Sequence, residues 1–306
     1  MRTYGLEEVR ETEEYILELI SFGILWKSYA HTALSVRYAP FITLTCMAEW
    51  RKKHQSLKPY IDIARGIFTT LYLLPQNQDS KELPIPTLEQ IDHVCKWFEA
   101  TGEFREEALR FVRWRAFWGT KQPEDLAKIF TTIREFRRWF EASSVEELGM
   151  YTENVNNFLQ KSNHRYRWRE DRISCTRTRA EYHLNMVGAE LMNRAFRAEF
   201  KETQSKVVLL PGCMRGHTNE DCKAKRVEEG LLCEMGKKWS PQKSQTSRGA
   251  IASACVTTLV EGGWELKRYD VPAQCVLLNY SGCKKHWHCA GISTELDIRE
   301  LKRILN

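Results

Sequence analysis

Three short apolar runs in the last hundred residues, each ending in a cysteine, constrain the fold more than any other feature of the chain. The runs are residues 206–213, 249–255 and 274–283. Apolar runs of this length, bounded by glycine or proline, are typical of fully buried strands in parallel sheets. Parallel neighbours bring their carboxyl ends to one edge, where α/β folds place their sites. We therefore expect Cys213, Cys255 and Cys283 to gather at that edge.

The residues before the first run carry helical signals. Thr87 with Gln90, and Ser144 with Glu147, fit the capping box, in which two side chains satisfy each other's free backbone donors. Pro123 stands where a first helical turn tolerates proline. Between these signals an apolar stripe recurs at steps of three and four, which predicts an amphipathic helix. The stripe consists of Leu126, Ile129, Phe130, Ile133, Phe136 and Phe140.

The predicted fold class is α+α/β, with a helical N-terminal half followed by a small α/β domain. The sheet of that domain is expected to be mainly parallel, with three strands or more. The predicted divisions are a helical region at 1–75, a linker at 76–86, a helical domain at 87–205 and a cysteine-rich α/β domain at 206–306. The last long helix is expected from about Ala180 to Phe200.

Composition favours a cytoplasmic protein without a membrane partner. No run approaches the ~18 consecutive apolar residues of a membrane span, and the amino terminus is too acidic for a secretory signal. The net charge of +6 permits acidic partners without requiring them.

The cysteines are concentrated in the second half of the chain. Of the ten, eight lie between Cys175 and Cys289. In a reducing cytosol such a cluster suggests metal binding or redox chemistry more than disulfides. The alternative is that a free cysteine is a buried small hydrophobe. That interpretation suits Cys46, Cys95 and Cys275, which sit inside apolar patterns.

Four thiolates can hold Zn²⁺ or a [4Fe–4S] cluster, although the chain has no C-x₂-C pair. Cys213 and Cys283 are the preferred ligands, because each follows a strand and a glycine that lets the backbone approach a bound group. Mixed Cys/His ligation would favour zinc and an all-cysteine set an iron–sulfur cluster. Cys255 has an alternative role at the start of a helix packed under the sheet. The candidate metal ligands are Cys213, Cys222, Cys233, Cys255, Cys283 and His286.

Two other groups of residues suggest different functions. His183 and Glu190 lie seven apart on one helix face, which suits either an acid/base pair of an enzyme or structural hydrogen bonds. The basic segment 161–179 interleaves arginines with Tyr166 and Trp168. Such a segment can bind an anionic small ligand or single-stranded nucleic acid, or it can be a solvated loop paired with acids. Its candidate binding residues are Arg165, Arg167, Arg169, Arg172, Arg177 and Arg179.

Four blocks of the sequence carry a family resemblance. They are residues 181–196, 208–215, 271–276 and 282–287. Over about residues 144–306 the chain resembles the prokaryotic cysteine-rich family catalogued as domain of unknown function 116. The resemblance implies a metal- or Fe–S-binding protein and supplies no reaction. It also implies more cysteines after Cys233, where this chain has a shorter, polar segment.

Overall fold

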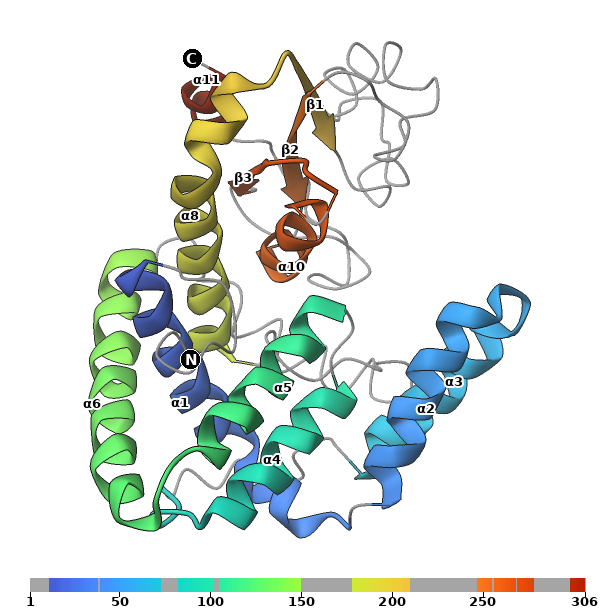
Figure 1. The fold of residues 1–306 in the computed structure, drawn as a ribbon, viewed down its shortest axis with the longest axis vertical. Helices are drawn as coiled ribbons and strands as arrows, with labels where there is room; N and C mark the ends of the chain where they lie inside the picture. Colours follow the sequence, from blue (N-terminus) through green and yellow to red (C-terminus); the bar gives the residue numbers. More distant parts are fainter. Residues whose placement is uncertain are drawn as a thin grey trace. The chain divides into compact units, whose positions relative to one another are not determined.

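The computed structural model describes nine stretches of the chain, and their contacts form two compact units (Figure 1). The described residues are 11–37, 39–72, 82–101, 105–149, 178–209, 247–254, 256–267, 269–277 and 298–305. The first unit comprises residues 1–147 and 163–181, and the second comprises 148–162 and 182–306. None of the described helices is both long and apolar enough to cross a bilayer.

The first unit is helical, as predicted. Its elements are α1 (Thr12–Ser35), α2 (Ala39–Lys53), the 3₁₀ turn η2 (Gln55–Leu57), α3 (Lys58–Tyr72), α4 (Leu88–Thr101), α5 (Arg105–Gly119) and α6 (Pro123–Leu148). The capping box before α4 is confirmed: the Thr87 N–H donates to Gln90 Oε1 at 3.0 Å, and the Gln90 N–H donates to Thr87 Oγ1 at 3.2 Å.

The second predicted capping box, at Ser144 and Glu147, is wrong. Helix α6 continues through both residues, and Ser144 is buried inside it. Ser144 lies four residues after the buried Phe140, so it falls on the same face of the helix as the apolar stripe. Packing of that face outweighs the local preference of serine for a helix start.

Aromatic side chains form the core of the first unit. The ring of Phe22 in α1 lies 5.2 and 5.1 Å from those of Trp114 and Trp118 in α5, and 5.8 Å from that of Phe130 in α6. Such pairs contribute about 0.5–1.5 kcal/mol each beyond the apolar area they bury. Leu83, within the predicted linker, packs against the same cluster. One hydrophobic core therefore includes residues from both sides of that segment.

Three arginines of α6 bind the carboxylate of Glu82, in the segment before α4. Arg134, Arg137 and Arg138 place nitrogens 3.2, 2.8 and 2.6 Å from its oxygens. The side chain of Arg137 is only 5% exposed, and its other terminal nitrogen lies 3.6 Å from Glu141. Burial raises the pKa of Glu82, but the hydrogen bond from Arg138 and the charges of the three arginines outweigh burial and hold the pKa below its usual value.

Replacing Glu82 with glutamine is expected to lower the free energy of unfolding at neutral pH by about 1 kcal/mol, because a buried arginine loses one of its carboxylate partners. The pKa of Glu82 is lower in the folded chain than its usual 4.5, so its contribution is complete above that pH and is lost as the pH falls through the folded-state value. Urea unfolding of E82Q and wild type from pH 7 to about pH 3 measures this, and the two free energies should converge at low pH.

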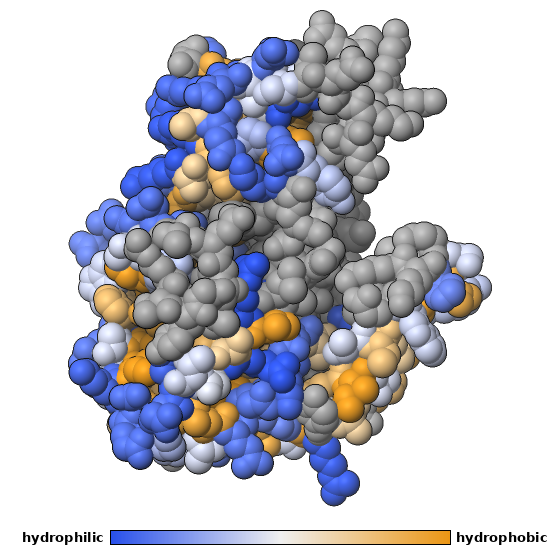
Figure 2. All heavy atoms as spheres, viewed as in Figure 1, coloured by the Kyte–Doolittle hydropathy of each residue, from blue (hydrophilic) through white to orange (hydrophobic). Residues whose placement is uncertain are grey.

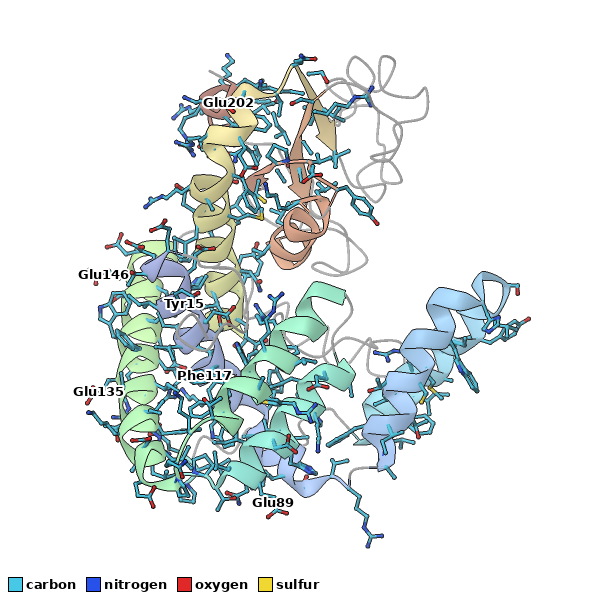
Figure 3. All side chains as sticks on the ribbon, viewed as in Figure 1. Tyr15, Glu89, Phe117, Glu135, Glu146 and Glu202 are labelled. Carbon is cyan, nitrogen blue, oxygen red and sulfur yellow. The ribbon has the colours of Figure 1, made fainter. Side chains whose placement is uncertain are left out.

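The matched control is Glu135→Gln. Glu135 lies on α6, the helix that carries the three arginines, and its exposed side chain points outward from that helix (Figure 3). We expect little change in this variant at any pH. A loss in E135Q as large as in E82Q, or a deficit in E82Q that persists at low pH, would contradict the assigned role of Glu82.

The second unit contains the predicted parallel sheet. Its strands are β1 (Ser205–Leu209), β2 (Arg248–Ala254) and β3 (Ala273–Leu277), in the order β1-β2-β3 with both pairs parallel. Helix α8 (Arg179–Glu202) precedes β1, α10 (Val256–Lys267) connects β2 to β3, and α11 (Ile298–Leu305) follows. The predicted fold class, helices first and a small parallel α/β sheet last, is confirmed.

Helices pack on both faces of the sheet. On one face Val208, Ile251 and Val276, from the three strands, form a cluster with Leu301 and Ile304 of α11. On the other face Ala252, Cys275 and Leu277 pack with residues of α8 and α10, including Met192 and Leu259. Strands β2 and β3 therefore have packed residues on both faces, which explains why their sequences are continuous apolar runs instead of alternating ones, whereas β1 begins at exposed residues and buries Val208.

Candidate metal site at the carboxyl edge of the sheet

The strand register brings the three carboxyl ends to one edge. Leu209 of β1 is level with Ala252 of β2, and Ala254 of β2 is level with Leu277 of β3. Neighbouring strands lie about 4.8 Å apart, so the two outer strands are separated by about 10 Å at this edge. That spacing is small enough for side chains on the segments after the strands to reach one ligand.

A cysteine follows each strand within a few residues of this edge. Cys255 comes directly after Ala254, Cys213 is the fourth residue after Leu209, and Cys283 is the sixth after Leu277. These three lie outside the described residues, as do Cys222, Cys233 and His286. The parallel arrangement on which the site depends is confirmed, and the ligand set stays a prediction. The described part of the chain holds no cluster of three potential metal ligands.

The described residue of most interest at this edge is Ser253, the penultimate residue of β2. Its side chain is fully buried, and its hydroxyl has no hydrogen-bond partner among the described residues. Alternation along the strand puts it on the same face as Ile251. An unsatisfied buried hydroxyl costs about 1–3 kcal/mol, and such groups are rare in native structures. Sequence reasoning missed Ser253, because a serine inside an apolar run carries no signal of its own.

A carboxamide from α8 fixes the outer strand of the sheet. Asn193 Nδ2 donates to the Cys275 carbonyl at 2.8 Å, and the Cys275 N–H donates back to Asn193 Oδ1. The neighbouring Gln274 Nε2 donates to the carbonyl of Asn193 at 3.0 Å. The amide of Asn193 thus pairs the backbone of Cys275 on the side where a fourth strand would bind. This contact sets the position from which the chain continues toward Cys283.

The three cysteines assigned to the core do not behave alike. Cys95 and Cys275 are buried, as predicted. Burial raises the pKa of both thiols, for Cys95 with a further contribution from the negative charge of Glu99, so neither supplies a thiolate. Cys46 is exposed, which corrects the prediction. It lies midway between the exposed Ile42 and Trp50 on α2, four residues from each, so an apolar pattern here marks an outer face.

The structure holds Glu190 away from His183. His183 is fully buried, whereas Glu190 binds Arg194 at 3.0 Å and Arg303 at 3.7 Å on a partly exposed surface. Seven residues of helix separate the two side chains by about 10.5 Å along the axis. Arg194 lies on the side of Glu190 that faces away from His183, so the carboxylate is drawn in that direction.

Most of the basic segment lies outside the described residues. That applies to Arg165, Arg167, Arg169, Arg172 and Arg177, whereas Arg179 is the first residue of α8.

The start of α8 carries a capping arrangement that the sequence prediction did not single out. The Glu181 N–H donates to Thr178 Oγ1 at 3.2 Å. The buried Glu181 carboxylate accepts hydrogen bonds from the Thr178 hydroxyl at 3.0 Å and from the Tyr29 hydroxyl at 2.9 Å. The T-x-x-E spacing was the available signal, because it places a carboxylate on the first turn of a helix.

No family model, curated protein or solved structure matches the chain.

Replacing Asn193 with leucine is expected to lower the free energy of unfolding by about 1–3 kcal/mol, because the buried N–H and carbonyl of Cys275 lose their partner. Hydrogen exchange gives a local readout: the Cys275 amide should exchange faster in N193L than in wild type. The control is Lys201→Leu, an exposed position on the same helix, where we expect a change within about 0.5 kcal/mol. Unchanged exchange at Cys275 in N193L would show that the carboxamide does not hold β3.

Proposed function

We propose that this protein binds a metal ion or an iron–sulfur cluster through cysteine thiolates at the carboxyl edge of the sheet. The observation that carries the proposal is the topology: three adjacent parallel strands, each followed within six residues by a cysteine. Cys213 and Cys283, which follow the two outer strands in the sequence, are the ligands we assign first, with Cys255, which follows the central strand, as the third.

The chemistry of the edge suits a thiolate-bound group. A segment after each of three strands can offer one ligand apiece, and a fourth place is open to Cys222, Cys233 or His286. The hydroxyl of Ser253, which has no partner among the residues that the structure describes, can supply a hydrogen-bond donor at the same edge. Hydrogen bonds to coordinating sulfur set the electron density of the sulfur, and with it the affinity and the reduction potential of a bound centre. A serine buried two residues before Cys255 is suited to that role.

The ligand set distinguishes the two metals. If His286 joins three cysteines, the mixed set favours Zn²⁺, which is colourless and has no redox chemistry. If the fourth ligand is Cys222 or Cys233, the all-thiolate set favours a [4Fe–4S] cluster, which can exchange electrons.

The test is elemental analysis and visible absorption of the full chain purified without oxygen. We expect either iron with sulfide and a broad brown absorption, or zinc without colour. Cys213→Ser and Cys283→Ser should each lose most of the metal, because serine oxygen is a poor replacement for thiolate sulfur. Cys46→Ser, at an exposed cysteine of the helical unit, should keep its metal and serves as the matched control.

Two results would overturn the proposal. If folded wild-type protein contains neither metal, the proposed function is wrong. Metal retained in both C213S and C283S would show that a centre exists elsewhere and that the strand ends do not form it.

A further inference from the structure

The turn between α2 and α3 exposes four large apolar side chains. Trp50, in the last turn of α2, is 60% exposed, and Leu57, in η2, is 49% exposed. Tyr60 and Ile63, in the first two turns of α3, are 72% and 60% exposed. The two helices form the antiparallel hairpin drawn in light blue in Figure 1, and Figure 2 shows hydrophobic side chains on its surface. Residues 50–63 are called the hairpin tip below.

The same stretch is strongly basic. The hairpin tip includes four lysines and arginines and one acidic residue, Asp62, so its formal charge is +3. The basic residues are Arg51, Lys52, Lys53 and Lys58. These fourteen residues therefore carry a formal charge equal to half of the net charge of +6 of the whole chain. Exposed aromatic and aliphatic side chains in a segment with an excess of basic residues are the composition of segments that lie in the interface of an anionic membrane.

The depth of the apolar side chains fits that environment. Trp50 is three residues before the end of α2, and Ile63 is five residues after the start of α3. At a rise of 1.5 Å per residue, both lie within about 8 Å of the turn along their helices. Interfacial helices bury their apolar face about 5–10 Å into the boundary between headgroups and acyl chains. Trp and Tyr are the side chains that favour this depth, because each has an apolar body and a polar hydrogen-bonding group.

We propose that the hairpin tip binds the surface of an anionic lipid bilayer. The four apolar side chains enter the headgroup region, and the basic residues contact lipid phosphates. This peripheral mode needs no spanning helix. It is independent of the metal proposal, because the tip and the sheet edge share no residue.

Other occupants fit the tip less well. Single-stranded nucleic acid would use Trp50 and Tyr60 for stacking but would leave the aliphatic Leu57 and Ile63 against a polar ligand. A second copy of the chain would bring two tips of like charge together, which opposes association. A lipid surface satisfies the apolar side chains and the positive charge together.

The hairpin is anchored to the first unit away from its tip. Arg65 of α3 is buried, and it donates to the Leu44 carbonyl of α2 at 2.6 Å and to the Ala100 carbonyl of α4 at 3.4 Å. Phe68, one turn further, packs against the aromatic core. Substitutions at the exposed tip therefore leave this anchor intact, and their effect on binding can be separated from an effect on folding.

The test is sedimentation of the full chain with vesicles of phosphatidylcholine alone or with a third phosphatidylglycerol. We expect binding only to the anionic vesicles, weakening as salt rises. Replacing Lys52 and Lys53 with glutamine should weaken binding about 30-fold, since each basic residue near the surface contributes about fivefold. Replacing Trp50 and Ile63 with serine should weaken it roughly tenfold or more by removing the inserted apolar groups.

Matched controls are available on α6. Trp139 is 59% exposed, nearly the same as Trp50, and Lys128 is exposed on the same helix. Trp139→Ser and Lys128→Gln should bind as wild type does, and thermal unfolding should show that all variants are folded.

Three results would overturn the proposal. One is equal binding to neutral and anionic vesicles. A second is that the protein binds a single-stranded oligonucleotide and not vesicles, and that the same tip variants lose this binding. That result would assign the surface to nucleic acid. The third is a dimer in sedimentation velocity that the W50S/I63S variant converts to a monomer, with no vesicle binding, which would assign the surface to a second copy of the chain.

Discussion

The two-sided parallel pairing of β2 is the constraint on which the rest of the second unit depends. A strand with a neighbour on each side and helices on both faces has little contact with water, so its backbone groups must be paired within the sheet. That requirement fixes the register of β1 and β3 and gives the sheet a single carboxyl edge. It also leaves Ser253 without a route to solvent.

The elements that sequence reasoning predicted correctly are those whose signal is local. The apolar runs of the strands, the stripe of α6 and the capping box at Thr87 are contained in windows of a few residues, and the structure confirms each of them. Ser144 shows the limit of the same reasoning. Its pattern matched a helix start, but its position on the buried face of a longer helix decided the outcome. A local sequence pattern predicts secondary structure correctly only where tertiary packing does not oppose it.

The features that escaped prediction depend on residues far apart in the chain. Asn193 meets Cys275 across 82 residues, and Glu82 meets the arginines of α6 across more than 50. No periodicity or spacing encodes such pairs. The same limit applies to the cysteines. Cys46 and Cys95 both lie in apolar patterns, yet Cys46 is exposed and Cys95 is buried. The sequence predicted the candidate site as an edge of the sheet, because the apolar runs indicated adjacent parallel strands. It did not predict the buried hydroxyl of Ser253 at that edge.

The unequal connections of the sheet also set an order of assembly. The segment between β1 and β2 has 38 residues (210–247), and the one between β2 and β3 has 18 (255–272) and contains α10. Closing the longer segment costs about 0.7 kcal/mol more chain entropy for a flexible loop, and a helix shortens the smaller one further. We therefore expect the β2–α10–β3 unit to close first and β1 to add to a strand pair that already exists. Two of the three strands would then be paired before β1 completes the carboxyl edge of the sheet.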